Sequence, residues 1–210
     1  MCDNRAMIFR RSLPGLILVA LLGGAGGAMV ARMLAQKSVV LHSGTWLPQP
    51  RPLAAFTLLD LAGRAFDNSA LLKHPSLLFF GFTACPEICP TTLATMAALM
   101  KNAPLPDLQL LFASVDPERD QAAILRPYLA SFDPHFIGLV GSAAALAPLL
   151  HSLGASAERH ALADGSYSID HSATLYLLDT HGRMAAVFSP PFEAASLRAD
   201  LERIARAAAL

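Results

Sequence analysis

The sequence predicts an α/β domain with a mixed central sheet flanked by helices, and one transmembrane helix before it. Three observations lead to this prediction: a long uncharged run near the N-terminus, short apolar runs typical of buried strands, and amphipathic segments that alternate with those runs. The 210 residues suffice for one ordinary domain with such an anchor. The chain has 16 basic and 16 acidic residues, so it lacks the excess of positive charge that would predict binding to nucleic acid.

The membrane anchor is predicted at residues 12–32. Ser12–Ala31 is a run of 20 uncharged residues, and as a helix it would span ~30 Å, about the thickness of the hydrocarbon core. Residues 1–11 contain Arg5, Arg10 and Arg11 against a single Asp3, so this segment is positively charged. The positive-inside rule therefore predicts that it stays in the cytoplasm. We expect a single-pass protein of the bacterial inner membrane, with its functional domain in the periplasm. A cleavable signal peptide is the alternative, since Gly26-Gly27-Ala28 resembles a cleavage site.

Residues 33–52 are predicted to form a tether between the membrane and the domain. Pro48, Pro50 and Pro52 lie in this stretch, and its apolar residues show little periodicity. The folded domain is therefore expected over residues 53–210.

Strands and helices alternate along this domain. A hairpin is expected at 56–60 and near Phe66, a central strand at 77–82 and a helix from Pro90 to Met100. Further strands are expected at 108–115 and 136–140, helices at 120–131 and 142–153, a second hairpin at 173–179 and 184–188, and a final amphipathic helix at 192–209. This order is typical of a thioredoxin-like fold.

Cys85 and Cys89 are the two cysteines of the predicted domain, since Cys2 precedes the apolar run. A spacing of four residues places both sulfurs on one side of a helical turn, close enough to chelate one ion or to form a disulfide. They lie where a buried strand runs into a helix, and a helix N-terminus stabilises thiolate. A purely structural disulfide is an alternative, although so short a loop would gain little stability. A structural zinc site would need a second ligand pair, and the sequence has none.

His171 is the histidine expected to face this pair. It directly precedes the strand at 173–179, which in a thioredoxin-like sheet lies beside the strand that leads to Cys85. His181 is the rival, but it lies at the far end of that strand, ~20 Å away at the rise of a strand. Two thiolates and one imidazole form a soft ligand set that suits Cu(I) and, with an added ligand, tolerates Cu(II). The adjacent Asp170 either orients the imidazole or caps the turn.

Three sequence blocks resemble the SCO/SenC family of copper proteins. The blocks are Gly81-Phe82-Thr83-Ala84-Cys85-Pro86-Glu87-Ile88-Cys89-Pro90-Thr91-Thr92-Leu93, Ser114-Val115-Asp116-Pro117-Glu118-Arg119-Asp120 and Asp170-His171-Ser172-Ala173. They occur in order over nearly the whole of the predicted domain. Departures from the family pattern are Ala84, the missing Gly-Gly before the first strand and the proline-rich tether, none of which involves a ligand position.

The resemblance implies a thioredoxin fold and copper ligation by Cys85, Cys89 and His171. It also implies a metallochaperone that delivers copper to the CuA site of cytochrome c oxidase during assembly, after receiving it from an upstream donor protein. Asp116–Asp120 has an open role: it reads as a turn with the acidic start of the next helix, or as a support for the site or for partner recognition.

The other function that the sequence supports is a thiol-disulfide oxidoreductase. In that case Cys85 would attack a partner disulfide, such as that of the oxidase copper site, and Cys89 would resolve the mixed disulfide. Enzymes of this type typically have two residues between their cysteines and need no histidine, whereas three residues intervene here. A thiol peroxidase is a weaker alternative, because its Thr-x-x-Cys pattern is missing before Cys85. The sequence therefore favours a metallochaperone and leaves enzymatic activity open.

Overall fold

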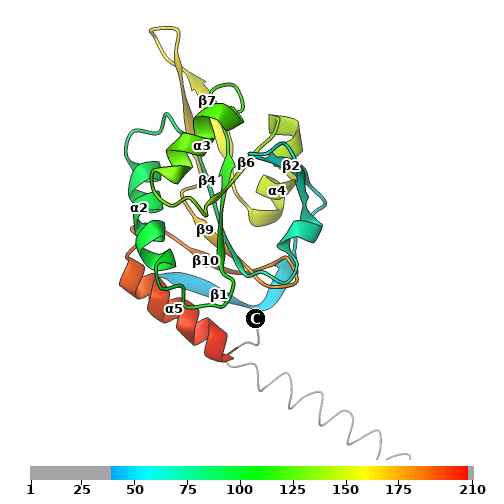
Figure 1. Cartoon of the computed structure of the whole chain (residues 1–210), viewed down its shortest axis with the longest axis vertical. Helices are drawn as coiled ribbons and strands as arrows, with labels where there is room; N and C mark the ends of the chain where they lie inside the picture. Colours follow the sequence, from blue (N-terminus) through cyan, green and yellow to red (C-terminus); the bar gives the residue numbers. More distant parts are fainter. Residues whose placement is uncertain (1–38, 208–210) are drawn as a thin grey trace, which may run out of the picture. The chain divides into compact units, whose positions relative to one another are not determined.

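The computed structural model describes residues 39–207, and these include a compact unit beginning at Val39. The main sheet has eight strands in the order β1-β10-β9-β4-β5-β6-β2-β3 (Figure 1). Its middle strands β4 (Ser76–Gly81), β5 (Gln109–Ser114) and β6 (Ile137–Val140) are parallel. Antiparallel strands flank them: β9 (Leu175–Leu178) and β10 (Arg183–Phe188) on one side, β2 (Thr57–Asp60) and β3 (Ala65–Asp67) on the other. The mixed sheet and both predicted hairpins are confirmed.

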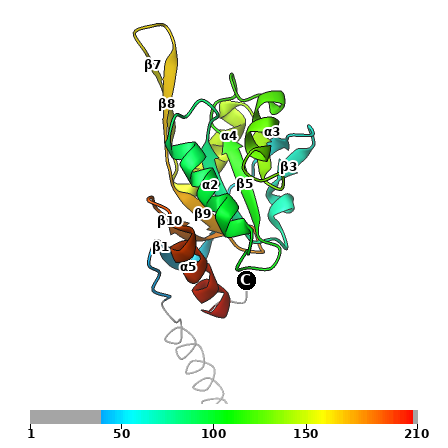
Figure 2. The same cartoon turned by 60° about the vertical axis from the view of Figure 1, so that its left-hand side comes forward.

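Helices cover both faces of this sheet (Figures 1 and 2). One face packs against α2 (Ile88–Met100), α3 (Ala122–Ala130) and α5 (Ala194–Ala207). The other packs against α4 (Ala143–Leu153) and the short 3₁₀ helix η1 (Asn68–Leu71). All four predicted α-helices are present, with ends shifted by a few residues.

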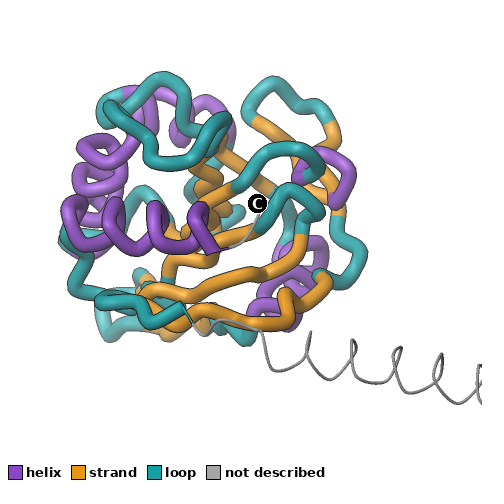
Figure 3. Tube along the Cα trace, turned by 90° about the horizontal axis from the view of Figure 1, so that it is seen from below, coloured by secondary structure: helices purple, strands orange, loops and turns teal. Residues whose placement is uncertain are grey.

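The central strand β4 is buried along its whole length, as its continuous apolar run predicts. Its side chains alternate between the two faces, so Leu77 and Phe79 join the core beneath α2, while Leu78 and Phe80 join the core beneath α4. A tube view from below shows how the strands lie between the helical layers (Figure 3). The strand therefore holds its carboxyl end, where the cysteine loop begins, in a fixed place.

The predicted tether differs from the structure over residues 44–52. These residues form an edge strand, β1 (Gly44–Pro52), which pairs with β10. The prolines are tolerated because β1 lies at the edge of the sheet and its pairing is irregular between Trp46 and Arg51. The compact unit therefore starts well before the predicted boundary at residue 53.

A second, two-stranded sheet has no counterpart in the sequence prediction. It consists of β7 (Ala157–Ala161) and β8 (Tyr167–His171), an antiparallel hairpin that projects from the rest of the domain (Figures 1 and 2). None of its residues is fully buried. Only Tyr167 and Ile169 alternate with polar residues in β8, and a pattern this short does not predict a strand.

The predicted anchor at 12–32 lies outside the described residues. Among residues 39–207, no helix combines the length and the hydropathy that a membrane crossing requires.

Candidate metal centre

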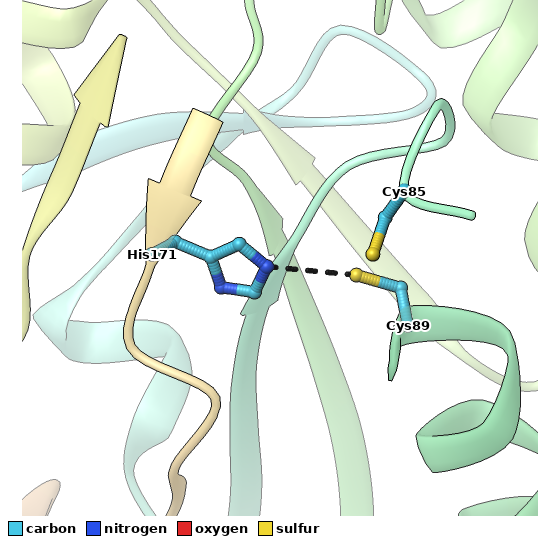
Figure 4. Close-up of side chains that lie close together, drawn as sticks. All are labelled: Cys85, Cys89 and His171. Carbon is cyan, nitrogen blue, oxygen red and sulfur yellow. Dashed lines mark hydrogen bonds between the residues drawn. The ribbon is translucent and has the colours of Figure 1, made fainter. Parts of the chain in front are cut away.

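The two cysteines lie at the carboxyl end of β4. After Phe82 the chain makes a tight turn, in which the Cys85 amide donates a hydrogen bond to the carbonyl oxygen of Phe82 (3.3 Å). Cys85 is partly exposed, whereas Cys89 is the second residue of α2 and is fully buried. Both are free thiols, and Figure 4 shows their sulfurs facing one another. The turn and the start of α2 therefore place the two sulfurs close together.

His171 approaches the two sulfurs from a different part of the chain. It is the last residue of β8, and the chain continues from it into β9. Because β9 runs antiparallel to β4 and Leu175 pairs with Phe79, the start of β9 lies near the end of β4. The Nε2 atom of His171 is 3.7 Å from the sulfur of Cys89 (Figure 4). The predicted meeting of His171 with the cysteine turn is confirmed.

The imidazole of His171 is held in a defined orientation. Its Nδ1 lies 3.2 Å from the carbonyl oxygen of Ser172, and because a carbonyl only accepts, Nδ1 carries the proton and Nε2 keeps its lone pair. The rings of Phe79 and Phe82 contact the imidazole edge to face, at centroid distances of 6.2 and 5.7 Å. Burial lowers the pKa of His171, which favours the neutral ring that binds metal ions.

Burial has the opposite effect on the protonation of Cys89. Desolvation raises the pKa of this thiol well above its ordinary value, and a hydrogen bond from the backbone of Phe82 only partly opposes it. The start of α2 thus does not produce the stabilised thiolate at Cys89 that its sequence position suggests. A metal ion that binds Cys89 must therefore displace a proton from it.

Gly81, the last residue of β4, makes room for the buried sulfur. A Cβ atom at this position would lie 3.0 Å from the Cys89 sulfur and 2.8 Å from the ring of Phe112. These separations are shorter than carbon makes in ordinary packing. The small residue therefore lets the sulfur of Cys89 pack directly against the strand.

Asp120 holds the loop that leads to Cys85. Its buried carboxylate accepts hydrogen bonds from the backbone amide of Thr83 (3.0 Å), from the Thr83 hydroxyl (2.5 Å) and from the Ser114 hydroxyl (2.7 Å). Helix α3 begins only at Ala122 and has no acidic residue in its first turn. The predicted turn is confirmed at residues 117–119, but the acidic residues precede the helix and do not start it, and the contacts of Asp120 support the loop that leads to Cys85.

Two other residues weighed from the sequence lie away from the ligand atoms. The side chain of Asp170 is 83% exposed and faces His160 at 3.3 Å, so the carbonyl of Ser172, and not Asp170, bonds the imidazole. His181 is exposed at the far end of β9, where it bridges to Leu72. Its distance from the cysteines agrees with the preference for His171.

An open depression of about 350 Å³ is bordered by two of the three ligand residues, Cys85 and His171. Its walls include Phe82, Cys85, Ile169 and His171, and its rim carries Ile88, which is 52% exposed. Cys85 and His171 thus face the open depression, whereas the buried Cys89 does not border it.

The three residues fit a single soft metal ion. Their ligand atoms all lie within 4.8 Å of one another, and within residues 39–207 this is the one group of His, Cys, Asp and Glu side chains so arranged. Typical metal–sulfur and metal–nitrogen distances of about 2.0–2.3 Å let two ligands of one ion lie roughly 4.5 Å apart. Small side-chain movements would therefore close the site around an ion.

Residues 48–206 match the SCO1/SenC family model. A protein of Stutzerimonas stutzeri that is named for copper binding is 34% identical over 175 residues, which cover 82% of this chain and 83% of that protein. An SCO2-like protein of Rickettsia felis is 36% identical over 132 residues, covering 61% of this chain but only 64% of that protein.

Among solved structures, ScoI of Bradyrhizobium japonicum with copper bound is similar to this chain. The two are 37% identical and superpose with a TM-score of 0.65, over 72% of this chain and 98% of ScoI. The mixed α/β fold thus matches the thioredoxin-like fold of Sco structures.

Proposed function

Because this chain belongs to the SCO1/SenC family, we propose that it is a copper metallochaperone that binds copper through Cys85, Cys89 and His171. Its target is the CuA-bearing subunit of cytochrome c oxidase, to which it delivers copper during assembly. An upstream protein supplies the copper, and residues 12–32 hold the protein in the bacterial inner membrane with the domain in the periplasm. In this function copper is the substrate that the protein carries and releases.

The convergence of two sulfurs and one imidazole nitrogen is the observation that carries the proposal. Thiolates and imidazole together select Cu(I) over hard cations, and such a set can also hold Cu(II) with an added ligand. The orientation of His171 supports this use, since its Nδ1 faces the Ser172 carbonyl and its Nε2 faces Cys89. The ligand set therefore matches the metal in the copper-bound ScoI structure.

The unequal burial of the two sulfurs suits transfer better than storage. Cys89 and the buried side of His171 would retain the ion, while Cys85 borders the open depression. An incoming ligand of the acceptor would first replace Cys85, because that sulfur can be reached from outside. The exposed Ile88 beside it offers an apolar contact for the acceptor protein.

Copper binding by purified full-length protein tests the proposal. We expect one Cu(I) per chain under anaerobic conditions, and loss of this binding in Cys85→Ser and Cys89→Ser. Ser168→Ala, on the wall of the same depression, serves as the matched control and should bind like wild type. Absence of Cu(I) binding by wild type would exclude the metallochaperone.

Oxidase assembly tests the proposed target. Deletion of the gene should lower oxidase activity under copper limitation, and added copper should restore part of it. Complementation should succeed with wild type and fail with Cys85→Ser. Normal oxidase activity in the deletion strain at low copper would exclude cytochrome c oxidase as the target.

A thiol-disulfide reductase is the second candidate, and the partial exposure of Cys85 beside the buried Cys89 favours it. The Cys85 thiolate would attack a partner disulfide to form a mixed disulfide. Cys89 would then attack the Cys85 sulfur, which releases the reduced partner dithiol and leaves a Cys85–Cys89 disulfide that a thiol reductant must reduce. This reaction does not require His171, so a His171→Ala variant that keeps reductase turnover while its affinity for copper falls would separate the two activities.

A further inference from the structure

The hairpin that carries His171 lies outside the main sheet. Strands β7 and β8 pair with each other in a separate sheet that projects from the domain (Figure 2). At its base, the amide of Ser172 donates to the carbonyl of Ser156 (3.0 Å). The main sheet places the start of β9 near the cysteines, but its ladder does not include β8, so side-chain contacts of the hairpin also help to set the position of His171.

Tyr167, the first residue of β8, makes polar and cation–π contacts of this kind, in addition to the packing of Ala157 and Ile169 against the core. The guanidinium carbon of Arg119 lies 3.9 Å from the centre of the Tyr167 ring, and that of Arg159 lies 3.6 Å from it. Arg159 is paired in turn with Glu118 at 2.5 Å. One cation–π contact, from Arg119, and the ion pair of the hairpin residue Arg159 with Glu118 thus join the hairpin to the segment that follows β5.

Asp116 fixes Arg119 and Tyr167 relative to each other. Its carboxylate is buried, accepts a hydrogen bond from the Tyr167 hydroxyl (2.8 Å) and forms an ion pair with Nε of Arg119. Arg119 also donates from Nη1 to the backbone carbonyl of Tyr167 (3.3 Å). Charge-assisted hydrogen bonds of this type hold defined geometry.

Arg119 also touches the cysteine side of the site. Its guanidinium carbon lies 5.6 Å from the centre of the Phe82 ring, and Phe82 packs edge to face against the imidazole of His171. The next residue, Thr83, is held by Asp120. Arg119 therefore lies between the loop that leads to Cys85 and the strand that ends in His171.

We propose that Arg119 is the positioning residue of the copper site, which through Tyr167 and Phe82 sets the place of His171 beside the two sulfurs. This inference rests on the proposed copper function. Without the guanidinium, the hairpin loses the contacts of Arg119 with Tyr167 and Phe82, while both cysteines keep their own positions in the turn and in α2. The bond from Tyr167 to Asp116 and the pair of Arg159 with Glu118 remain, and neither of them involves Phe82. The protein would then bind copper through its thiols and lose the imidazole ligand.

The test compares wild type with Arg119→Leu in the full-length chain. The matched control is Arg183→Leu, because Arg183 pairs in the same way with a buried aspartate, Asp179, at the opposite end of β9 (2.7 Å). In metal-free protein, NMR contacts between the rings of His171 and Phe82 should be lost in Arg119→Leu and kept in Arg183→Leu. With Cu(II) alone as the probe, imidazole nitrogen coupling in the EPR spectrum should disappear in Arg119→Leu, whereas Cu(I) stoichiometry stays at one per chain.

Unchanged ring contacts and unchanged nitrogen coupling in Arg119→Leu would overturn the inference. If wild type binds no copper, the proposed function fails, and the metal-free ring contacts still decide the role of Arg119. Should Arg119→Leu fail to fold, Tyr167→Phe removes only the hydroxyl that bonds Asp116. Amide hydrogen exchange in β7 and β8 should then be at least about tenfold faster than in wild type, and wild-type exchange in this variant would equally overturn the inference.

Discussion

The Nε2 of His171 lies 3.7 Å from the sulfur of Cys89, although 82 positions separate the two residues in sequence. The antiparallel pairing of β9 with β4 brings them together, and the Ser172 carbonyl turns the ring so that its unprotonated nitrogen faces the sulfur. This contact is the one on which the ligand role of the histidine depends.

Replacement of His171 by alanine is therefore expected to weaken copper binding without abolishing it. The two thiols remain and still hold Cu(I), whereas Cu(II), which requires harder nitrogen ligands, should be lost. We expect the affinity for Cu(I) to fall at least about tenfold, or ~1.4 kcal/mol, as measured by competition with a Cu(I) chelator. His181→Ala, in the exposed turn after β9, is the control and should leave the affinity unchanged. Equal affinities of His171→Ala and wild type would remove His171 from the ligand set.

Replacement of Gly81 by alanine is expected to displace the sulfur of Cys89. The new methyl group would lie 3.0 Å from this sulfur and 2.8 Å from the Phe112 ring, in a fully buried region. Overpacking of this kind costs about 1–3 kcal/mol of folding free energy, and the shifted sulfur should lower the affinity for copper. Chemical denaturation and Cu(I) competition measure the two effects.

Gly154→Ala provides the control for Gly81→Ala. Gly154 ends α4 with a φ of +66°, and no atom lies within 4 Å of the added methyl group. The alanine there should cost roughly 1 kcal/mol through backbone strain and leave copper affinity as in wild type. A loss of copper affinity in both variants would mean that stability, and not the position of Cys89, controls binding.

Replacement of Asp120 by asparagine is expected to loosen the loop before Cys85. The carboxylate accepts bonds from the amide and hydroxyl of Thr83 and from Ser114, and an amide group would turn a donor toward some of these donors. Loss of charge-assisted bonds at a buried site costs about 2–4 kcal/mol. Thermal denaturation should show this loss, and the Cys85 thiol should react faster with an alkylating reagent. Asp179→Asn, which disrupts a buried aspartate at the other end of the sheet, should lower stability without changing the reactivity of Cys85.

The sequence predicted the elements whose signals are local. The apolar run of β4 and the strand after His171 stand out by composition, and a thioredoxin-like order of elements brings His171 to the cysteines. The strand β1 was not predicted, because its prolines resemble a linker and only its pairing with β10 makes it a strand. The extended conformation of residues 44–52 therefore depends on tertiary contacts and not on a local sequence signal.

The support of the site was harder to predict than its ligands. The hairpin β7–β8 has no fully buried residue, and its clearest signal is Asp164-Gly165 at the turn, where Gly165 has a φ of +81°. Because the hairpin is not predicted from the sequence, the contact of Arg119 with Tyr167 cannot be predicted from it either. The acidic block around Arg119 therefore resembled an ordinary helix start, although its partners lie 37 and 51 positions away.

Acid is expected to detach the segment before β1 from α5, because Asp200 joins them. Burial raises the pKa of Asp200, but hydrogen bonds from the amides of His42 and Ser43 and from the Ser43 hydroxyl outweigh it, so the pKa lies below its ordinary value. Arg203 faces the same carboxylate at 3.3 Å and also contacts the ring of His42 at 2.9 Å. The folded protein thus prefers the ionised form.

A group whose pKa is lowered by folding adds stability above its unfolded pKa of about 3.9, and this stability is lost as the pH falls through the folded value. The difference in unfolding free energy between wild type and Asp200→Asn should therefore be large at pH 7, about 2–3 kcal/mol, and shrink below about pH 4. Denaturation curves between pH 7 and 3 measure it. Glu202→Gln, on the exposed side of the same helix with its carboxylate 3.7 Å from Arg206, should stay within about 0.5 kcal/mol of wild type. A wild-type advantage over Asp200→Asn that does not shrink in acid would show that ionisation of Asp200 does not hold this segment on α5.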